Sequence, residues 1–298
     1  MPQADVNTTA SGEKISLEYE TFGSPADPAL LLIMGFTAQM TLWPEAFCSE
    51  LAECGRFVIR FDNRDCGLST KLDGVQVDVG AVVVAALAED PAVMPAVPYT
   101  LSDMATDAVG LLDHLGIAAA HIAGASMGGM IAQTFAIEHS DRTLSLISIM
   151  STTGEPEVST PSPEAGAALL AAPPTEREAY IESAVGSMVW KSKKYGDLDT
   201  TRVEYARDYD RSFYPDGSPR QLAAIYASGR RTDALAALDT PTLVIHGRDD
   251  TLIPMEGGLR TSELVSGSKL LLLADMGHDL PEPLWPTVID AIISHTNL

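Results

Sequence analysis

The sequence predicts an α/β protein in which a mostly parallel sheet is flanked by helices and interrupted by one inserted helical segment. Short runs that are apolar throughout recur along the chain, as expected of strands that helices cover on both faces. Helical patterns stand between these runs, and such alternation is typical of a parallel sheet with right-handed crossovers. The alternation stops over residues 153–235, where no such run occurs. A chain of 298 residues is long enough for one large core that carries an insertion.

Seven segments are predicted to be strands. Six are continuous apolar runs, which favours strands buried on both faces. Residues 14–20 instead alternate polar and apolar side chains, which predicts an exposed antiparallel strand at the edge of the sheet. The six buried runs are 30–34, 57–61, 121–123, 144–149, 242–245 and 269–273.

Three helices are predicted from apolar residues at helical spacing, over 101–115, 127–139 and 288–295. Ser102 and Asp103 are candidates to cap the first helix, because both side chains can accept a hydrogen bond from an N-terminal amide.

The segment 153–235 is predicted to form a helical cap over the carboxyl edge of the sheet, while 1–152 and 236–298 form the core. Prolines cluster where the segment begins, and it holds 8 of the 18 aromatic residues of the chain. Most of these rings are expected to pack in the small core of the cap itself, and others to line a substrate pocket. A shorter excursion, 71–99, is rich in Val and Ala and predicts an extra helix near the same edge.

The formal net charge of −22 argues against two classes of partner. A nucleic-acid backbone and an anionic membrane surface would both be repelled by such a chain. The charge also disfavours strongly anionic substrates. We therefore expect a small neutral molecule as the ligand, and the sequence leaves the oligomeric state open, with a dimer among the options.

Cysteine content and the first residues predict a cytoplasmic location. Cys48, Cys54 and Cys66 are odd in number and lack metal-like spacing, so reduced thiols are the simplest interpretation. The first residues lack the basic start and apolar stretch of a secretory signal, and no apolar run is long enough to span a bilayer.

Residues 124–128, Gly-Ala-Ser-Met-Gly, fit the G-x-S-x-G pattern between a predicted strand and a predicted helix. Glycines flank such a serine because the turn is strained and side chains there would collide. The turn exposes the serine oxygen at a helix N-terminus, where amides favour developing negative charge. The motif predicts Ser126 as a nucleophile; the alternative is a structural glycine turn with an idle serine.

A serine nucleophile needs a base, and His278 is the best candidate of six histidines. It follows the last strand run, at the edge of the sheet where Ser126 also emerges. The alternative is that His278 is a solvated loop residue. The other histidines are less suitable: His114, His139 and His295 fall in or at the ends of helices, His121 starts a strand, and His246 precedes a glycine turn that more naturally presents an acid.

The base in turn needs a carboxylate that fixes its tautomer. Asp249 and Asp250 both follow the strand that ends near His246, and sequence logic alone allows either of them. The order Ser, Asp, His along the chain is the one expected of this architecture.

Taken together, these segments resemble the α/β-hydrolase superfamily, and within it the capped serine esterase branch that includes aclacinomycin methylesterase and related carboxylesterases. The resemblance extends from about Glu13 to the last helix. It is carried by residues 34–36, 62–69, 124–128, 247–254 and 277–278.

The resemblance implies roles for particular residues. It favours Asp250 over Asp249, and it implies an oxyanion hole formed by the backbone amides of Phe36 and Met127. Residues Met34, Gly35, Phe36 and Met127 are then expected to line the substrate site.

The chain departs from the family pattern in two places. Met34 stands where a histidine is common, and Asp65 stands where the Arg-Gly-x-Gly-x-Ser loop has its first glycine. The excursion at 71–99 is also longer than in close relatives, which affects the shape expected for the pocket.

The predicted function is hydrolysis of a small to medium neutral carboxylic ester through an acyl-enzyme intermediate. No metal or cofactor is expected, because metalloprotease, dinucleotide and P-loop motifs are missing and Asp275, His278 and Asp279 lack further ligands. Lactone hydrolysis, C–C bond hydrolysis and cofactor-free perhydrolysis use the same triad and remain alternatives. A small-molecule receptor on the same fold is an alternative of another class.

Overall fold

The computed structural model describes residues 2–9, 11–88 and 93–297, and its centre is one eight-stranded sheet. The strand order is β1-β2-β4-β3-β5-β6-β7-β8, and β3 to β8 all run parallel to their neighbours within this group. The parallel α/β arrangement predicted from the sequence is therefore confirmed. The strands are β1 (Gln3–Thr8), β2 (Lys14–Phe22), β3 (Ala29–Ile33), β4 (Phe57–Phe61), β5 (Ala120–Ala125), β6 (Thr143–Ile149), β7 (Thr242–Gly247) and β8 (Lys269–Leu273).

The edge of the sheet differs from the prediction. Strand β2 is antiparallel to β4, as expected, but β1 pairs with its other side, so β2 is not the edge strand. The sequence QADVNT of β1 offers little apolar signal, since only Ala4 is buried. Its position depends on tertiary packing against β2 and helix α3 (Leu101–His114), which local sequence does not reveal.

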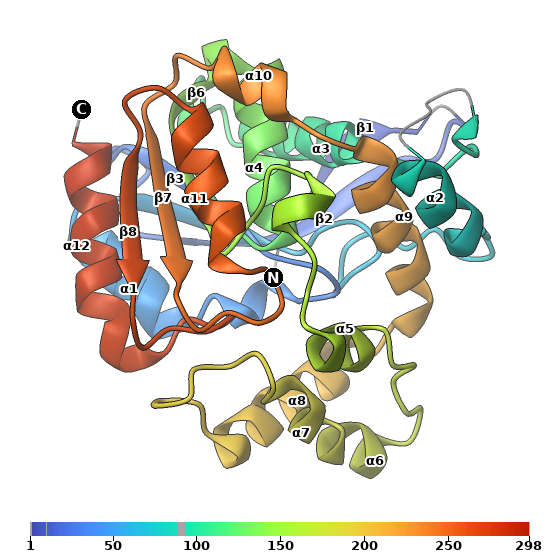
Figure 1. Cartoon of the computed structure of the whole chain (residues 1–298). Helices are drawn as coiled ribbons and strands as arrows, with labels where there is room; N and C mark the ends of the chain where they lie inside the picture. Colours follow the sequence, from blue (N-terminus) through green and yellow to red (C-terminus); the bar gives the residue numbers. More distant parts are fainter. Residues whose placement is uncertain (1, 10, 89–92, 298) are drawn as a thin grey trace.

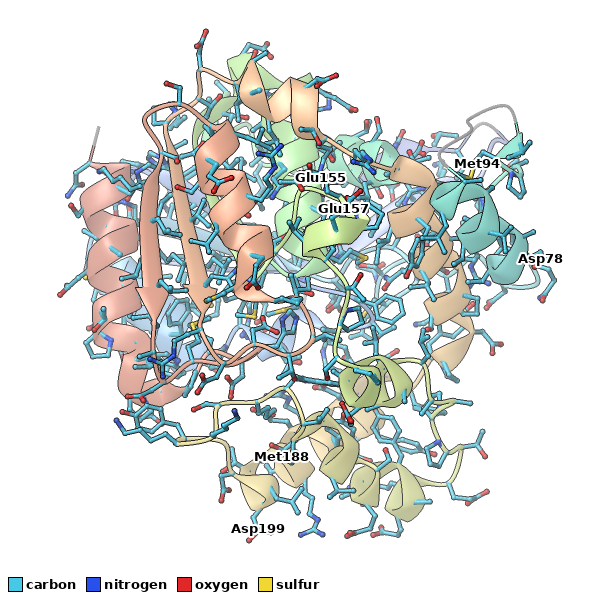
Figure 2. All side chains as sticks on the ribbon, viewed as in Figure 1. Asp78, Met94, Glu155, Glu157, Met188 and Asp199 are labelled. Carbon is cyan, nitrogen blue, oxygen red and sulfur yellow. The ribbon has the colours of Figure 1, made fainter. Side chains whose placement is uncertain are left out.

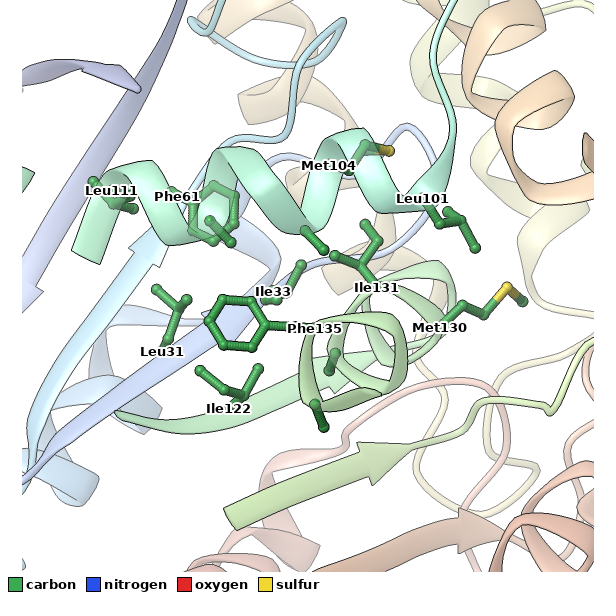
Figure 3. Close-up of a cluster of buried hydrophobic side chains, with 14 of the residues drawn as sticks. Leu31, Ile33, Phe61, Leu101, Met104, Leu111, Ile122, Met130, Ile131 and Phe135 are labelled. Carbon is green, nitrogen blue, oxygen red and sulfur yellow. The ribbon is translucent and has the colours of Figure 1, made fainter. Parts of the chain in front are cut away.

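Helices cover both faces of the sheet (Figure 1). Leu31 and Ile33 of β3 point into a core under α3 and α4 (Met127–Glu138), while Leu30 and Leu32 point into a second core under α1 (Glu45–Glu53) and α12 (Trp285–Thr296). Figure 3 shows the first core, where Leu31, Ile33 and Ile122 of the sheet meet Phe135 of α4. This two-sided burial explains why the strand sequences are apolar throughout.

Helix α3 begins one residue before the predicted capping residues. Thr100 is the N-cap, and its hydroxyl accepts from Asp103 N while Asp103 Oδ2 accepts from Thr100 N. Asp103 thus completes a capping box from the third helical position, and Ser102 plays no part in the cap. The prediction of Ser102 was wrong because Thr100 offers the same chemistry at a better position.

Residues 153–235 contain helices and no strand. Helices α5 to α8 form a layer beyond the end of the sheet toward which the arrows of β7 and β8 point (Figure 1). Met188 and Asp199 lie in this layer (Figure 2). The last helix of the segment, α10, packs instead on α4 and α11. The helices are α5 (Pro163–Leu169), α6 (Arg177–Glu182), α7 (Ala184–Ser187), α8 (Leu198–Ser212), α9 (Ser218–Ser228), α10 (Thr232–Ala236) and, beyond the segment, α11 (Met255–Leu264).

Four aromatic rings of this segment pack on one another. Tyr180 of α6 lies 5.1 Å from Tyr205 and 5.5 Å from Tyr209 of α8, measured between ring centroids, and Tyr209 stacks on Phe213 at 4.7 Å. These rings form a small core between α6 and α8, as expected for most aromatics of the insertion.

The predicted extra helix between residues 71 and 99 is present as α2 (Val79–Leu87), although residues 89–92 lie outside the described part of the chain. It packs against α9.

Among the described residues, no helix combines the length and apolar character that a membrane span requires. The short elements whose bounds the described residues define are 3-10 turns at Met40–Leu42, Ser140–Arg142, Pro156–Val158, Pro215–Gly217 and Glu282–Leu284.

We predict that His121 makes the protein less stable in acid. Its ring is buried in β5, with Nδ1 2.8 Å from Ser145 Oγ, and burial, aided by Arg56 and His295, lowers its pKa to about 4. The unfolded chain binds a proton near pH 6.5, so stability is complete above that pH and falls as the pH drops toward 4. The loss is up to about 3 kcal/mol.

His121→Asn keeps a hydrogen-bonding group near the position of Nδ1 but does not titrate. Urea unfolding at pH 7.5 and pH 4.5 should show a smaller pH-dependent loss in this variant than in the unmodified protein. Equal losses in the two proteins would contradict the prediction.

Candidate active site

Ser126 lies in the turn between β5 and α4 and has a strained backbone, with φ of +59° and ψ of −123°. A Cβ atom on Gly124 would lie 1.9 Å from the carbonyl oxygen of Gly128, and one on Gly128 would lie 2.1 Å from that of Ile33. The turn therefore requires both glycines. Strain of this kind, about 1–3 kcal/mol, is found where the surrounding structure fixes a functional group.

His278 reaches Ser126 from the loop after β8. Its Nε2 lies 2.9 Å from Ser126 Oγ, and its Nδ1 lies 2.7 Å from Asp250 Oδ2. The backbone amide of His278 donates to the carbonyl of Trp190, at 2.7 Å, so the inserted segment holds this loop. The imidazole is 9% exposed, which leaves little water around its hydrogen bonds.

Asp250 is buried, and its carboxylate is fixed from two sides. Oδ1 accepts from the amides of Leu252 and Ile253, both at 2.9 Å, and Oδ2 faces His278. Burial raises the pKa of Asp250, but the interactions with His278 and His246 outweigh it, so the net pKa lies below its usual value. Asp250 therefore stays ionised. Asp249, the alternative left open by the sequence, makes a side-chain contact with Arg248.

His246 is a neighbour of Asp250 that sequence reasoning passed over as a participant. Its buried Nε2 lies 2.9 Å from the carbonyl of Ile253 and 3.5 Å from Asp250 Oδ2. Because the carbonyl can only accept, Nε2 carries the hydrogen. The sequence feature that could have identified His246 is its position at the end of β7, four residues before Asp250.

The turn at residues 35–38 lies beside Ser126. A Cβ atom on Gly35 would lie 3.0 Å from the Cβ of Ser126, so the turn packs closely against the nucleophile. The backbone amide of Phe36 belongs to the next residue of this turn. Asn63 Nδ2 donates to the carbonyl of Met34 at 2.8 Å. The second expected donor, the amide of Met127, belongs to the first residue of α4.

The residues expected to line the substrate site differ in exposure. Phe36 is half-buried, and Met34 is buried. Met127 is fully buried and its side chain packs in the core under α3 and α4, so only its backbone can serve the site. The prediction that Met127 lines the substrate site can therefore concern only its backbone, because helix α4 turns the side chain inward.

Asp65, which replaces a glycine of the family pattern, has a positive φ of +61°. Its carboxylate forms an ion pair with Arg220 of α9, at 2.8 Å, and accepts from the hydroxyl of Tyr99, also at 2.8 Å. These contacts compensate for a backbone conformation that glycine adopts without strain.

A serine, an imidazole and a carboxylate that share one line of hydrogen bonds at the end of this sheet define a serine hydrolase. The chain belongs to the α/β-hydrolase fold family, whose model matches residues 28–282.

Relatives and solved structures agree with this assignment. The chain is 27% identical to the rhodomycin D methylesterase DauP of a Streptomyces species, over 95% of this chain and 96% of that protein. It is 29% identical to a 2-hydroxy-6-oxononadienedioate/2-hydroxy-6-oxononatrienedioate hydrolase of Burkholderia vietnamiensis, over 92% and 88%. The structure is similar to an enol-lactonase from Burkholderia xenovorans, with a TM-score of 0.73, 22% identity and full coverage of both chains.

Proposed function

We propose that the chain hydrolyses a small to medium neutral carboxylic ester, with Ser126 as nucleophile, His278 as base and Asp250 as the acid that orients it. The continuous hydrogen bonding from Ser126 Oγ through His278 to Asp250 carries the proposal. The methylesterase relative supports an ester as the substrate.

In the first step, Ser126 Oγ attacks the acyl carbon while His278 Nε2 takes its proton. The carbonyl oxygen becomes an oxyanion held by the amides of Phe36 and Met127, each typically worth about 3 kcal/mol of barrier lowering. His278 then gives the proton to the leaving alcohol. The acyl group remains on Ser126 as an ester.

In the second step, water attacks the acyl-enzyme while His278 takes its proton, and the acid leaves as Ser126 regains a hydrogen. Asp250 stabilises the imidazolium in both steps without taking its proton, consistent with its low pKa. The substrate contacts Met34, Gly35, Phe36 and the backbone of Met127.

Residues 153–235 act as a cap on a core made of 1–152 and 236–298. Buried ion pairs between Arg211 and Asp62, at 2.7 Å, and between Arg220 and Asp65 support a firmly docked cap. The boundary at 235 is drawn through α10, which itself packs on the core.

A cytoplasmic location is supported by the free thiols of the three cysteines.

Hydrolysis of a C–C bond is the second candidate. The Burkholderia vietnamiensis relative is named a hydrolase of a dienedioate and a trienedioate, and each of these compounds is a dianion because it carries two carboxylates. A net charge of −22 opposes the approach of such dianions. We therefore expect kcat/KM for neutral methyl and p-nitrophenyl esters to exceed that for dianionic C–C substrates by roughly tenfold or more. Neutral lactones, which this charge does not repel, are the third substrate type to compare.

A panel of these three substrate types with the purified protein tests the proposal. Repeated turnover of neutral esters supports it and separates an enzyme from a receptor. Preference for the dianionic substrate, or no more than one turnover of any ester, would overturn it.

A further inference from the structure

The turn beside Ser126 contains a strained residue. Ala38 N donates to the carbonyl of Gly35 at 3.3 Å, and Thr37, the third residue of this turn, has a φ of +56°. This position of a type II turn normally requires glycine or asparagine. A β-branched residue in the left-handed region is an outlier that persists only when its surroundings fix it.

Gln221 supplies that restraint from helix α9. Its Oε1 accepts from Thr37 N at 2.8 Å, and its Nε2 donates to the carbonyl of Arg64 at 2.9 Å. The Gln221 side chain is fully buried, and its hydrogen bond to Arg64 is buried with it, whereas Thr37 lies at the exposed end of the other bond. Gln221 thus connects the turn to the loop after β4, using both ends of its amide.

Other contacts hold the turn at different points. Cys66 Sγ lies 3.2 Å from the carbonyl of Thr37, a weak hydrogen bond. Asn63 holds Met34 before the turn, and Asp62 Oδ1 accepts from Met40 N after it, at 2.7 Å. The amide of Thr37 itself is bonded to Gln221.

We propose that Gln221 is a positioning residue that holds the oxyanion-hole turn against Ser126, so that the docked cap completes the catalytic geometry. This inference rests on the proposed function. A Cβ atom on Gly35 would lie only 3.0 Å from the Cβ of Ser126, so the turn packs closely against the nucleophile. A shift of the turn therefore changes the distance from the Phe36 amide to the oxyanion. A misplacement of about 1 Å can cost about 100-fold in rate.

Gln221→Met keeps the size of the side chain and removes both hydrogen bonds. We expect kcat to fall about 10- to 100-fold while KM changes less than about threefold, because the oxyanion forms only in the transition state. Affinity for a trifluoromethyl ketone, which forms a tetrahedral adduct with the serine, should fall in parallel. Ser228→Ala is the matched control: it removes the contact of α9 with Leu101 N and leaves the turn untouched, so kcat should stay near that of the unmodified protein.

A second substitution separates positioning from a merely structural role. Thr37→Gly removes the strain at φ +56°, so the turn keeps its shape with less restraint. When Thr37→Gly is combined with Gln221→Met, kcat should be several-fold higher than in Gln221→Met alone. Should Gln221→Met fail to fold, Gln221→Glu is compared instead; its buried, neutral carboxyl can make both hydrogen bonds and should retain most of kcat.

The outcomes distinguish failure of this inference from failure of the proposed ester hydrolysis on which it rests. If the unmodified protein turns over esters and Gln221→Met has the same kcat, the inference fails alone. A kcat loss that Thr37→Gly does not relieve, or a loss shared equally by Ser228→Ala, also overturns it. If the unmodified protein shows no ester turnover, the proposed function fails and this inference fails with it.

Discussion

Ser126→Ala is expected to lower kcat for ester hydrolysis by at least about 10⁴-fold while the protein remains folded. Without Oγ there is no atom to form the acyl-enzyme, and His278 Nε2 loses its partner at 2.9 Å. His278→Ala should cost a similar factor, because the two residues act as one unit. Steady-state kinetics with a p-nitrophenyl ester, together with thermal melting, measures both effects.

Ser145→Ala is the control for the serine substitution. Ser145 lies buried in β6 and contacts His121 rather than the site, so its removal should change kcat less than about threefold. Activity of Ser126→Ala within tenfold of the unmodified protein would contradict the assignment of the nucleophile.

Asp250→Asn is expected to lower kcat about 10⁴-fold through the wrong tautomer of His278. The amides of Leu252 and Ile253 donate to Oδ1, so an asparagine would place its carbonyl oxygen there and its NH₂ group toward His278 Nδ1. Nδ1 would then accept and Nε2 would carry the hydrogen. An imidazole in that tautomer cannot take the proton of Ser126.

Asp249→Asn is the matched comparison, one residue away. Its carboxylate makes a peripheral contact with Arg248, so kcat should change less than about threefold. A pH series of kcat for both variants checks the result, and a larger effect at Asp249 than at Asp250 would contradict the arrangement described here.

Strong local patterns predicted most of the fold. The continuous apolar runs marked the parallel strands because both faces of the sheet are covered, and the glycines around Ser126 marked a turn in which any larger residue collides with backbone. Strand β1 escaped prediction because its polar sequence takes its place through pairing with β2. Helix α10, at the boundary proposed at 235, is helical like the segment before it but packs on α4 and α11, and local sequence does not reveal this packing.

The three residues predicted for the triad are brought together, but their supports could not be predicted. Gln221 makes two hydrogen bonds across long sequence separations, and His246 contacts the carbonyl of Ile253 seven residues later. No periodicity in the sequence records such contacts. The positive φ of Thr37 likewise breaks the local preference of threonine. Local rules fail here because tertiary hydrogen bonds compensate for the strain.

Labelling with a fluorophosphonate, followed by mass spectrometry of the intact protein and its peptides, tests the central claim most directly. The reagent phosphonylates an activated serine, so we expect one adduct per chain, located on Ser126. In His278→Ala the rate of adduct formation should fall sharply. An adduct on another residue, or ester turnover that continues without any adduct at Ser126, would contradict the account.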